Sequence, residues 1–453
     1  MSAVLSPSDR MAYEAGFAQT IEQDTGLPSW LTSVRRTAFD AFLEQGWPTT
    51  KQEDWRFTDV TPITRLALLP PPAGKPHFAS DDFATDLLGL GGDSAQRLLF
   101  VDGRYHSGAA NGRPRPDDLC AIPLTSALAD NAGSVGQVLG HHLRSQNAFV
   151  ALNTAFMTDG AFVRIPAGFT SEAPIFLVFL ASVEGSASFP RTVIWAGANS
   201  QATIVEIHLG ADRRSTLATL ATLASSVTEI LLEPGAHVAY HGVQKASSAG
   251  CHVGHLAVTQ KAGSVFSGSN LALAGRMVRN DVHVLLAEEG CTCNLDGLYL
   301  AADASHIDNH TTIDHRSPRS TSREIYKGVV GERSRAVFSG RIVVRPNAQQ
   351  TDARQTNRNI VLCDGAIVHS KPHLEIFAND VKCSHGATTG RLNPDALFYL
   401  RSRGIGEKEA NQLLIRAFML EGLDCIAQTG LRSELENVLV KRIENLASAG
   451  GFA

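Results

Sequence analysis

Between residues 160 and 388, short apolar runs alternate with polar positions and are separated by glycines. A period of two is typical of a β-strand with one buried face. Four runs show it well and predict strands of about five residues each, at 161–165, 175–180, 203–207 and 226–232. No helical pattern of about ten residues lies between the runs, which disfavours alternating strand and helix units.

A second regularity lies at the ends of these runs, where a glycine is followed by small and β-branched residues. It occurs at Gly235, Gly263, Gly290, Gly331 and Gly365, at intervals of 28, 27, 41 and 34 residues. Irregular repeats of about 25–40 residues with several short strands are typical of a β-solenoid. A β-sandwich is the alternative, although roughly 200 residues would be long for one such domain.

Both ends of the chain show the 3.6-residue spacing of helices, which would cap a solenoid. Gly46 suits the end of a helix near the N-terminus, and Asn393 with Pro394 suits the start of one near the C-terminus. We therefore expect a mainly β protein of four regions. These are an N-terminal helical region with a linker (1–80), a mixed α/β connecting region (81–150), a solenoid core (151–390) and a C-terminal helical region (391–453).

The composition excludes several classes of protein. The 453 residues include 45 acidic and 40 basic ones, a balance that argues against a nucleic-acid-binding surface. No window of about 18 uncharged apolar residues predicts a membrane span, and the N-terminus does not resemble a secretory signal. The seven cysteines form no regular framework, so we expect reduced thiols and a cytoplasmic protein.

The sequence carries no P-loop, no G-x-S-x-G elbow, no H-E-x-x-H pair and no Rossmann glycine fingerprint. Histidines and aspartates crowd residues 306–315, where they either hold a divalent metal or form hydrogen-bonded rows along stacked coils. One enzymatic alternative follows: a carbohydrate-active solenoid in which Asp308, Asp314 and Arg316 form a lyase or hydrolase cleft.

Cys383 and His385 form the most informative pair. Two residues apart on a strand, they share one face, and a thiolate beside an imidazole is a soft pair of metal ligands. They close the last predicted strand, at an edge where another chain can add strands. The alternative is that they have no ligand role, and for Cys291 and Cys293 simple packing in the core is favoured.

The C-terminal region offers an apolar helix face between Ala410 and Phe418, flanked by Arg401, Arg403 and Arg416. This face either packs on the solenoid or docks in the groove of a partner. Nearer the N-terminus, Trp47 and Trp55 lie among charged residues, and we expect their indoles to cover the helical region.

Taken together, six segments resemble the SufB/SufD family of iron–sulfur cluster assembly scaffold proteins, and its SufD branch most closely. The matching segments are residues 51–58, 350–359, 371–376, 380–388, 397–405 and 414–418. The resemblance implies a right-handed parallel β-helix with helical parts at both ends. It also implies a non-catalytic scaffold that pairs with a SufB-like chain and carries a SufC-like ABC-type ATPase on its C-terminal helices, with a homodimer also possible.

The same resemblance assigns roles to particular residues. It places at His385 the histidine that assists iron entry or nascent cluster formation at the heterodimer interface, with Cys383 as its less supported companion. It implies no tightly bound cofactor, only transient iron or a transient iron–sulfur cluster. The positions that would contact the ATPase are Tyr399, Arg403, Leu414, Ala417 and Phe418.

Two features distinguish this chain from SufB-like members. Gly386 follows His385, where SufB-like chains carry a glutamate, and no cysteine follows Arg358-Asn359 until Cys363. The chain is therefore expected to lack the principal cluster thiolate and not to assemble a stable cluster alone. A self-assembling structural solenoid is a further alternative.

Overall fold

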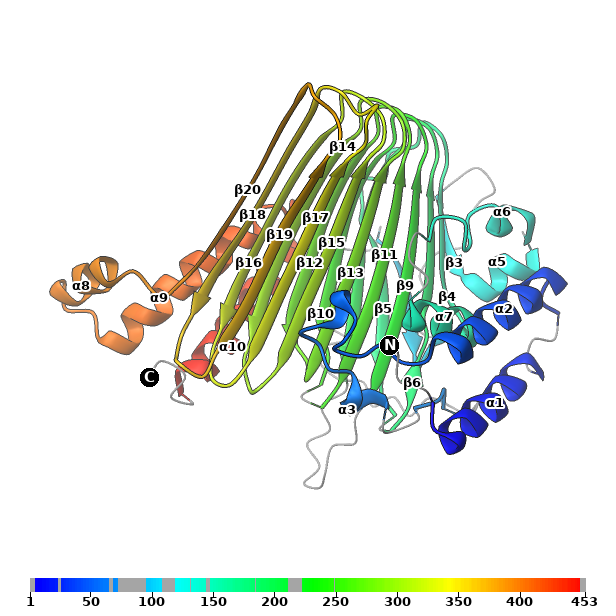
Figure 1. The fold of residues 1–453 in the computed structure, drawn as a ribbon, viewed down its shortest axis with the longest axis horizontal. Helices are drawn as coiled ribbons and strands as arrows, with labels where there is room; N and C mark the ends of the chain where they lie inside the picture. Colours follow the sequence, from blue (N-terminus) through cyan, green and yellow to red (C-terminus); the bar gives the residue numbers. More distant parts are fainter. Residues whose placement is uncertain are drawn as a thin grey trace.

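The computed structural model describes residues 5–22, 26–64, 68–71, 95–107, 119–130, 132–143, 147–183, 185–210, 222–247 and 249–448. Two long sheets, each of ten strands in the described residues, face one another along most of the molecule, with helices at both ends (Figure 1). We name them the β20 sheet and the β19 sheet, after their terminal strands.

The β20 sheet runs β2 (Arg104–Tyr105), β1 (Gln96–Val101), β5 (Ile175–Ala181), β8 (Gln201–Gly210), β10 (His237–Lys245), β12 (Val265–Ala274), β14 (Thr292–Ala301), β16 (Thr321–Val330), β18 (Thr351–Val361), β20 (Val381–Gly390). The β19 sheet runs β19 (Ile367–Ile376), β17 (Arg335–Val344), β15 (His306–His315), β13 (Met277–Leu286), β11 (Cys251–Gln260), β9 (Leu223–Leu232), β7 (Arg191–Ala196), β4 (Gly160–Ile165), β3 (Cys120–Pro123), with β6 (Ala187–Ser188) also paired to β9.

The chain alternates between the two sheets, so that each coil contributes one strand to each, and about eight coils stack into a β-solenoid. This confirms the predicted fold class. Successive strands from β9 to β19 begin 26 to 32 residues apart, at 223, 251, 277, 306, 335 and 367. The predicted strand length was wrong in the central coils, where strands run about ten residues. Hydrogen bonds from the neighbouring coils keep a strand extended even where its side chains are polar.

Helices near the N-terminus pack on the outer face of the β19 sheet. They are α1 (Pro7–Glu22), α2 (Ser29–Gln45), the short helices η1 (Glu53–Trp55), α3 (Thr61–Thr64), α5 (Leu124–Asp130) and α6 (Ala132–Gly136), and α7 (Ala148–Phe156). Aromatic side chains of α1, α2 and α7 meet Cys251, Val253 and Met277 of the sheet. Trp47 and Trp55 are buried in the same cluster, as the sequence predicted.

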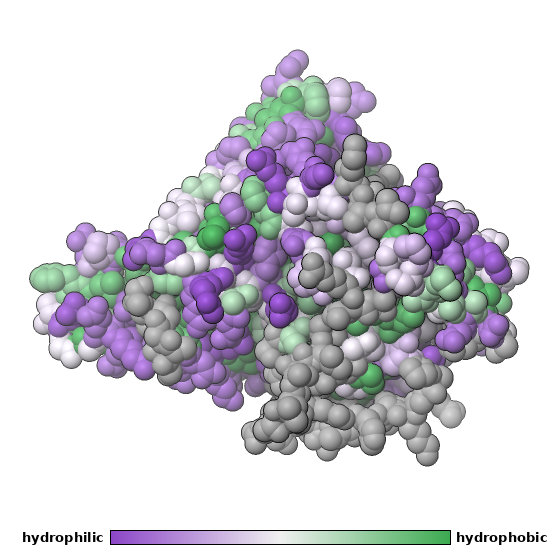
Figure 2. All heavy atoms as spheres, turned by 60° about the horizontal axis from the view of Figure 1, so that its bottom comes forward, coloured by the Kyte–Doolittle hydropathy of each residue, from purple (hydrophilic) through white to green (hydrophobic). Residues whose placement is uncertain are grey.

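The C-terminal helices pack on the outer face of the other sheet. Side chains of α9 (Glu407–Leu420), η3 (Glu421–Leu423) and α10 (Thr429–Ser448) cover Leu298, Leu300 and Val329. The nine residues of α8 (Pro394–Ser402) are all described, and none of them is buried. This helix projects beyond the last coil (Figure 1), and Figure 2 shows hydrophobic side chains on the surface of that lobe, at the left. No described helix is long and apolar enough to cross a membrane.

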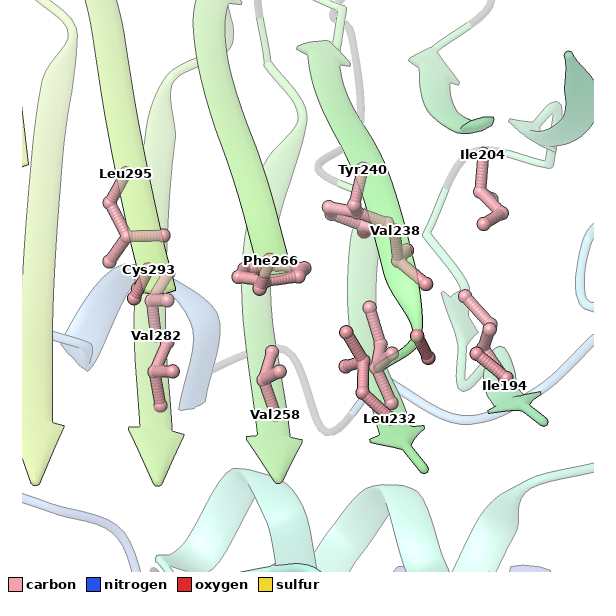
Figure 3. Close-up of a cluster of buried hydrophobic side chains, with 14 of the residues drawn as sticks. Ile194, Ile204, Leu232, Val238, Tyr240, Val258, Phe266, Val282, Cys293 and Leu295 are labelled. Carbon is pink, nitrogen blue, oxygen red and sulfur yellow. The ribbon is translucent and has the colours of Figure 1, made fainter. Parts of the chain in front are cut away.

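The core lies between the two sheets, because inward-facing residues alternate with outward-facing ones along every strand. Val238, Phe266 and Cys293 are in register on β10, β12 and β14, and they stack as one inner row (Figure 3). Valines from β11 and β13 face them from the other sheet. Cys291 and Cys293 are both buried in this core, which agrees with the expectation that they pack.

The interior also holds polar side chains, of which Glu324 on β16 is the most consequential. It is fully buried, and its Oε2 accepts a hydrogen bond of 2.7 Å from Nε2 of Gln355 on β18. Burial away from water disfavours the charged form, and it raises the pKa of Glu324 to about 7. The folded protein therefore binds this proton more tightly than the unfolded chain does.

This raised pKa gives a testable dependence of stability on pH. The protonated Glu324 stabilises the fold. This contribution is fully present below the pKa of the unfolded chain, near 4.5, and it is lost as pH rises through the pKa of the folded protein, near 7. Glu324→Gln cannot ionise, so its free energy of unfolding relative to wild type should rise by roughly 2 kcal/mol between pH 5 and pH 8. Urea unfolding at both pH values measures this, with the exposed Glu409→Gln as control. A constant difference between Glu324→Gln and wild type would contradict the raised pKa.

Candidate functional site

The terminal coil, made of β19 and β20, is the candidate site. β20 pairs with β18 and β19 pairs with β17, and among the described strands none pairs with their far edges. An edge strand presents a row of unpaired backbone N–H and C=O groups to which another chain can bind. The solenoid is therefore open at this end.

The composition of the terminal coil explains why it stays an edge. Most residues of β20 are polar or small and exposed, and only Val381 and Cys383 are half-buried. Added methyl groups at Gly386 and Gly390 would meet nothing within 4 Å. On β19, Pro372 lacks a backbone N–H, which is tolerated at an edge and not in the middle of a sheet.

Cys383 and His385 lie on the inner face of β20. Their partners in register on β18 are Ala353 and Gln355, which are both buried inside the solenoid. Cys383 packs against the core, while His385 is exposed because no further coil covers it. Burial raises the pKa of the Cys383 thiol, and the backbone N–H of Ala353 offsets part of that rise. A thiol must lose its proton to bind a metal, so this rise makes the Cys383 thiol a poorer metal donor at neutral pH.

The histidine-rich segment 306–315 forms β15, and its outward side chains make a hydrogen-bonded network. Asp308 accepts hydrogen bonds from Arg279 Nη1 at 2.6 Å and from Thr58 Oγ1 at 2.5 Å, and it pairs with His310 at 3.0 Å. In the part of the chain that the structure describes, no three histidine, cysteine or acidic side chains gather as a metal site. Of the two interpretations of this segment, the structure favours the hydrogen-bonded row.

The alternative carbohydrate-cleaving site does not assemble. Asp308 and Asp314 are six residues apart on one strand, which separates them by about 20 Å. Asp308 is buried under Thr58 and Arg279, while Asp314 is paired with Arg345 and Arg316 through contacts of 2.8 and 3.2 Å. A pair of catalytic carboxyl groups would have to flank one bond.

The segment 53–58 crosses the outer face of the β19 sheet, which the sequence did not predict. The Arg279 guanidinium lies 3.7 Å from the centre of the Trp55 ring, and Phe57 stacks on His369 at 4.1 Å. Glu53 pairs with Lys371 at 2.5 Å. The segment therefore ties the N-terminal region to the terminal coil. The sequence offered one indirect signal for this contact: segments 51–58 and 371–376 are both among the six segments that carry the family resemblance.

The residues expected to contact an ATPase fall in two places. On α8, Tyr399 is 57% exposed, and its hydroxyl accepts a hydrogen bond of 3.0 Å from Arg403. On α9, Ala417 is exposed, but Leu414 and Phe418 are half-buried, and Phe418 packs against the helix–sheet cluster. The sequence missed Phe398, which is 74% exposed and is the most exposed large apolar side chain on α8.

Phe418 also links α9 to the solenoid. Lys327 of β16 and Arg358 of β18 lie over its ring at 5.2 and 5.8 Å, and both are within ion-pair distance of Glu421 in η3. Part of the predicted docking face is therefore used inside this chain.

Comparisons with known proteins identify the family. The family model described as "SUF system FeS cluster assembly, SufBD core domain" matches residues 179–418, and the model of the "SufBD protein N-terminal region" matches residues 17–177. The chain is 32% identical over 411 residues to an iron–sulfur cluster assembly SufBD family protein of Synechocystis sp., covering 90% of each chain. It is 29% identical over 407 residues to the iron–sulfur cluster assembly protein SufD of Escherichia coli, covering 87% of this chain and 88% of that one.

The core model alone spans more than half of the 453 residues, and it includes the terminal coil with Cys383 and His385. The chain therefore belongs to the SufBD family of iron–sulfur cluster assembly proteins.

Proposed function

We propose that this chain is a SufD-like, non-catalytic scaffold subunit that pairs with a SufB-like chain through its terminal coil and binds a SufC-like ATPase through its C-terminal helices. The observation that carries the proposal is the open terminal coil, which holds Cys383 and His385 on its inner face at an unpaired sheet edge. Within a family of iron–sulfur assembly proteins, such an edge is where two chains would share a nascent cluster.

The terminal coil suits a protein partner for two reasons. Its edge strands offer backbone hydrogen bonds to incoming strands. The end of β19 adds apolar surface, since its last residue, Ile376, is 42% exposed and the next residue, Phe377, is 56% exposed. A SufB-like strand laid against β20 would bury this surface and enclose His385. A second copy of this chain would use the same edges, and the resting form is then a homodimer.

The proposed role of His385 is to hold iron weakly as cargo, not as a resident cofactor. A neutral imidazole is a metal ligand that exchanges readily, and the Cys383 thiol beside it is held protonated by its partial burial. His385, joined by Cys383 only once its thiol is deprotonated, leaves the remaining ligand positions of a cluster to the partner. A cluster held by few ligands from each chain is easier to pass on than one held by four thiolates. Cytoplasmic conditions would keep Cys383 reduced.

The proposed ATPase contact is centred on α8. This helix buries none of its residues in the chain, and its Phe398 and Tyr399 are exposed to solvent, as is Arg403 directly after its end. Ala417 and the exposed parts of Leu414 and Phe418 on α9 would extend the contact. Because Phe418 and Glu421 also touch Lys327 and Arg358, a docked ATPase would be connected to β16 and β18 through α9.

Removal of the imidazole tests the role of the terminal coil. We expect His385→Ala to fold and to pair with the SufB-like chain, because the side chain is exposed, but to lower iron–sulfur enzyme activity in cells at least about tenfold. Cys383→Ser should have a smaller effect. The measurement is the activity of a cluster-dependent enzyme in cells that depend on this system. Thr388→Ala is the control, because Thr388 is exposed on the outer face of β20. Normal cluster delivery by His385→Ala would remove His385 from the mechanism.

Substitution on α8 tests the ATPase contact. The double variant Phe398→Ser/Tyr399→Ser should keep its melting temperature, since both side chains are exposed, and should bind the SufC-like ATPase at least about tenfold more weakly. Phe418→Asp should weaken binding and also lower the melting temperature, because that ring is half-buried.

Calorimetric titration of the purified chain with the ATPase measures both effects. Met11→Ser, an exposed apolar residue on α1 that is 69% exposed, is the matched control and should bind normally. Unchanged affinity in the α8 double variant would move the ATPase contact elsewhere on the chain.

A further inference from the structure

An inner row of side chains runs along the β20 sheet and ends at His385. Register pairing places Leu295, Glu324, Gln355 and His385 side by side on β14, β16, β18 and β20. All four positions face the inside of the solenoid. Neighbouring strands are about 4.8 Å apart, so each side chain of the row is within reach of the next.

Gln355 is held in one orientation within this row. Its Nε2 donates to Oε2 of Glu324 at 2.7 Å, and the ionised carboxylate only accepts hydrogen bonds, so above pH 7 the nitrogen is the end that faces β16. Gly340 on the opposite sheet makes room for this placement, because a methyl group there would come within 2.2 Å of Nε2. The amide is planar, and its oxygen is therefore turned away from Glu324.

The oxygen of this amide is an unused acceptor. Gln355 is buried, and its Oε1 has no hydrogen-bond partner among the described residues. A buried acceptor without a partner is unfavourable, and most such groups in proteins are paired. The next side chain in the row is the imidazole of His385, which carries an N–H in either of its neutral forms.

We infer that Gln355 is a positioning residue for His385: the structure does not contain this hydrogen bond, but a turn of the exposed imidazole would let Oε1 accept its Nδ1–H and leave the Nε2 lone pair free for iron or a nascent cluster. Ligand histidines commonly donate their second ring N–H to an acceptor that fixes the tautomer and the direction of the ring. Glu324 acts one step further back by fixing which end of the amide faces β20. The inference rests on the proposed function of His385 but predicts a property that is measured without it.

The experiment is nitrogen NMR of the full chain labelled with ¹⁵N-histidine, at pH 8.5, where ordinary imidazoles are neutral. Long-range couplings to the ring carbon-bound protons report the tautomer, and the signals missing from His385→Asn assign His385. Wild type should show the Nδ1–H form. Gln355→Leu should shift His385 to the Nε2–H form, which free imidazole prefers, and should lower cluster delivery in cells at least about tenfold.

Two further variants separate positioning from folding. Gln244→Leu is the matched control, because Gln244 is also buried on the inner face with an unpaired Oε1 but lies on β10, far along the solenoid. It should leave the His385 signals unchanged. Glu324→Leu keeps the Gln355 acceptor but frees its amide to turn, and should give a mixture of the two tautomers. This variant carries the test if Gln355→Leu does not fold.

The results distinguish this inference from the proposed function. An Nε2–H or averaged tautomer in wild type, or no change in Gln355→Leu, overturns the inference even if His385→Ala abolishes delivery. A tautomer that depends on Gln355 together with normal delivery by His385→Ala supports the positioning and overturns the proposed role of His385.

Discussion

The rest of this structure depends on the parallel, in-register pairing of each coil with the next. From β9 onward, successive coils are paired in parallel over about ten positions in the β19 sheet, and over eight to ten positions in the β20 sheet, where one register shift occurs at Gln244 and Lys245. Every inner position therefore repeats as a row, and each strand in the described stack is hydrogen-bonded to a neighbour on both sides, whereas a strand at either end of a sheet has only one. At the beginning of the solenoid, the antiparallel strands β2 and β3 close the sheets. At β19 and β20 no further described strand follows. The unpaired backbone groups of the edge, the open interior of the solenoid and the candidate ligands Cys383 and His385 therefore lie at the same place.

Row formation also explains how the solenoid tolerates polar groups inside. A polar side chain on one coil meets the side chain at the same position on the next, so the two can hydrogen-bond, as Asn280 does with Asn309 at 3.1 Å. Glu324 and Gln355 form another such pair. The pairing is one-dimensional, so the last member of a row lacks its outer neighbour. His385 is that last member. It is exposed because no further coil covers it, whereas Gln355 is buried because β20 lies over it.

Several elements could be predicted from local sequence, because local rules govern them. The run at 161–165 lies in β4, the run at 175–180 lies in β5, and the Asn393 side chain caps α8 as expected. The glycine phrases were harder to interpret. Gly235, Gly263 and Gly290 have positive φ in turns on one side of the solenoid, whereas Gly331 and Gly365 lie in turns on the other side. On the first side, Arg319 and Gln350 later take the left-handed conformation without glycine, which explains the irregular intervals. The pairing of Glu53 with Lys371, 318 residues apart, has no local signal at all.

The C-terminal helices show why a docking face could not be read from an apolar stripe. The buried face of α9 differs from the predicted stripe: Ile415 and Met419, which were not among the predicted positions, are buried on the solenoid, and Phe418 of the stripe lies between the solenoid and solvent. Because Phe418 and Glu421 contact Arg358, and Arg358 pairs in register with Thr388, α9 is one strand away from β20. Under the proposed function, an ATPase seated on α8 and α9 would act on β18, the strand that also carries Gln355. The strand in contact with the docked helices would then be the same one that sets the direction of the His385 imidazole.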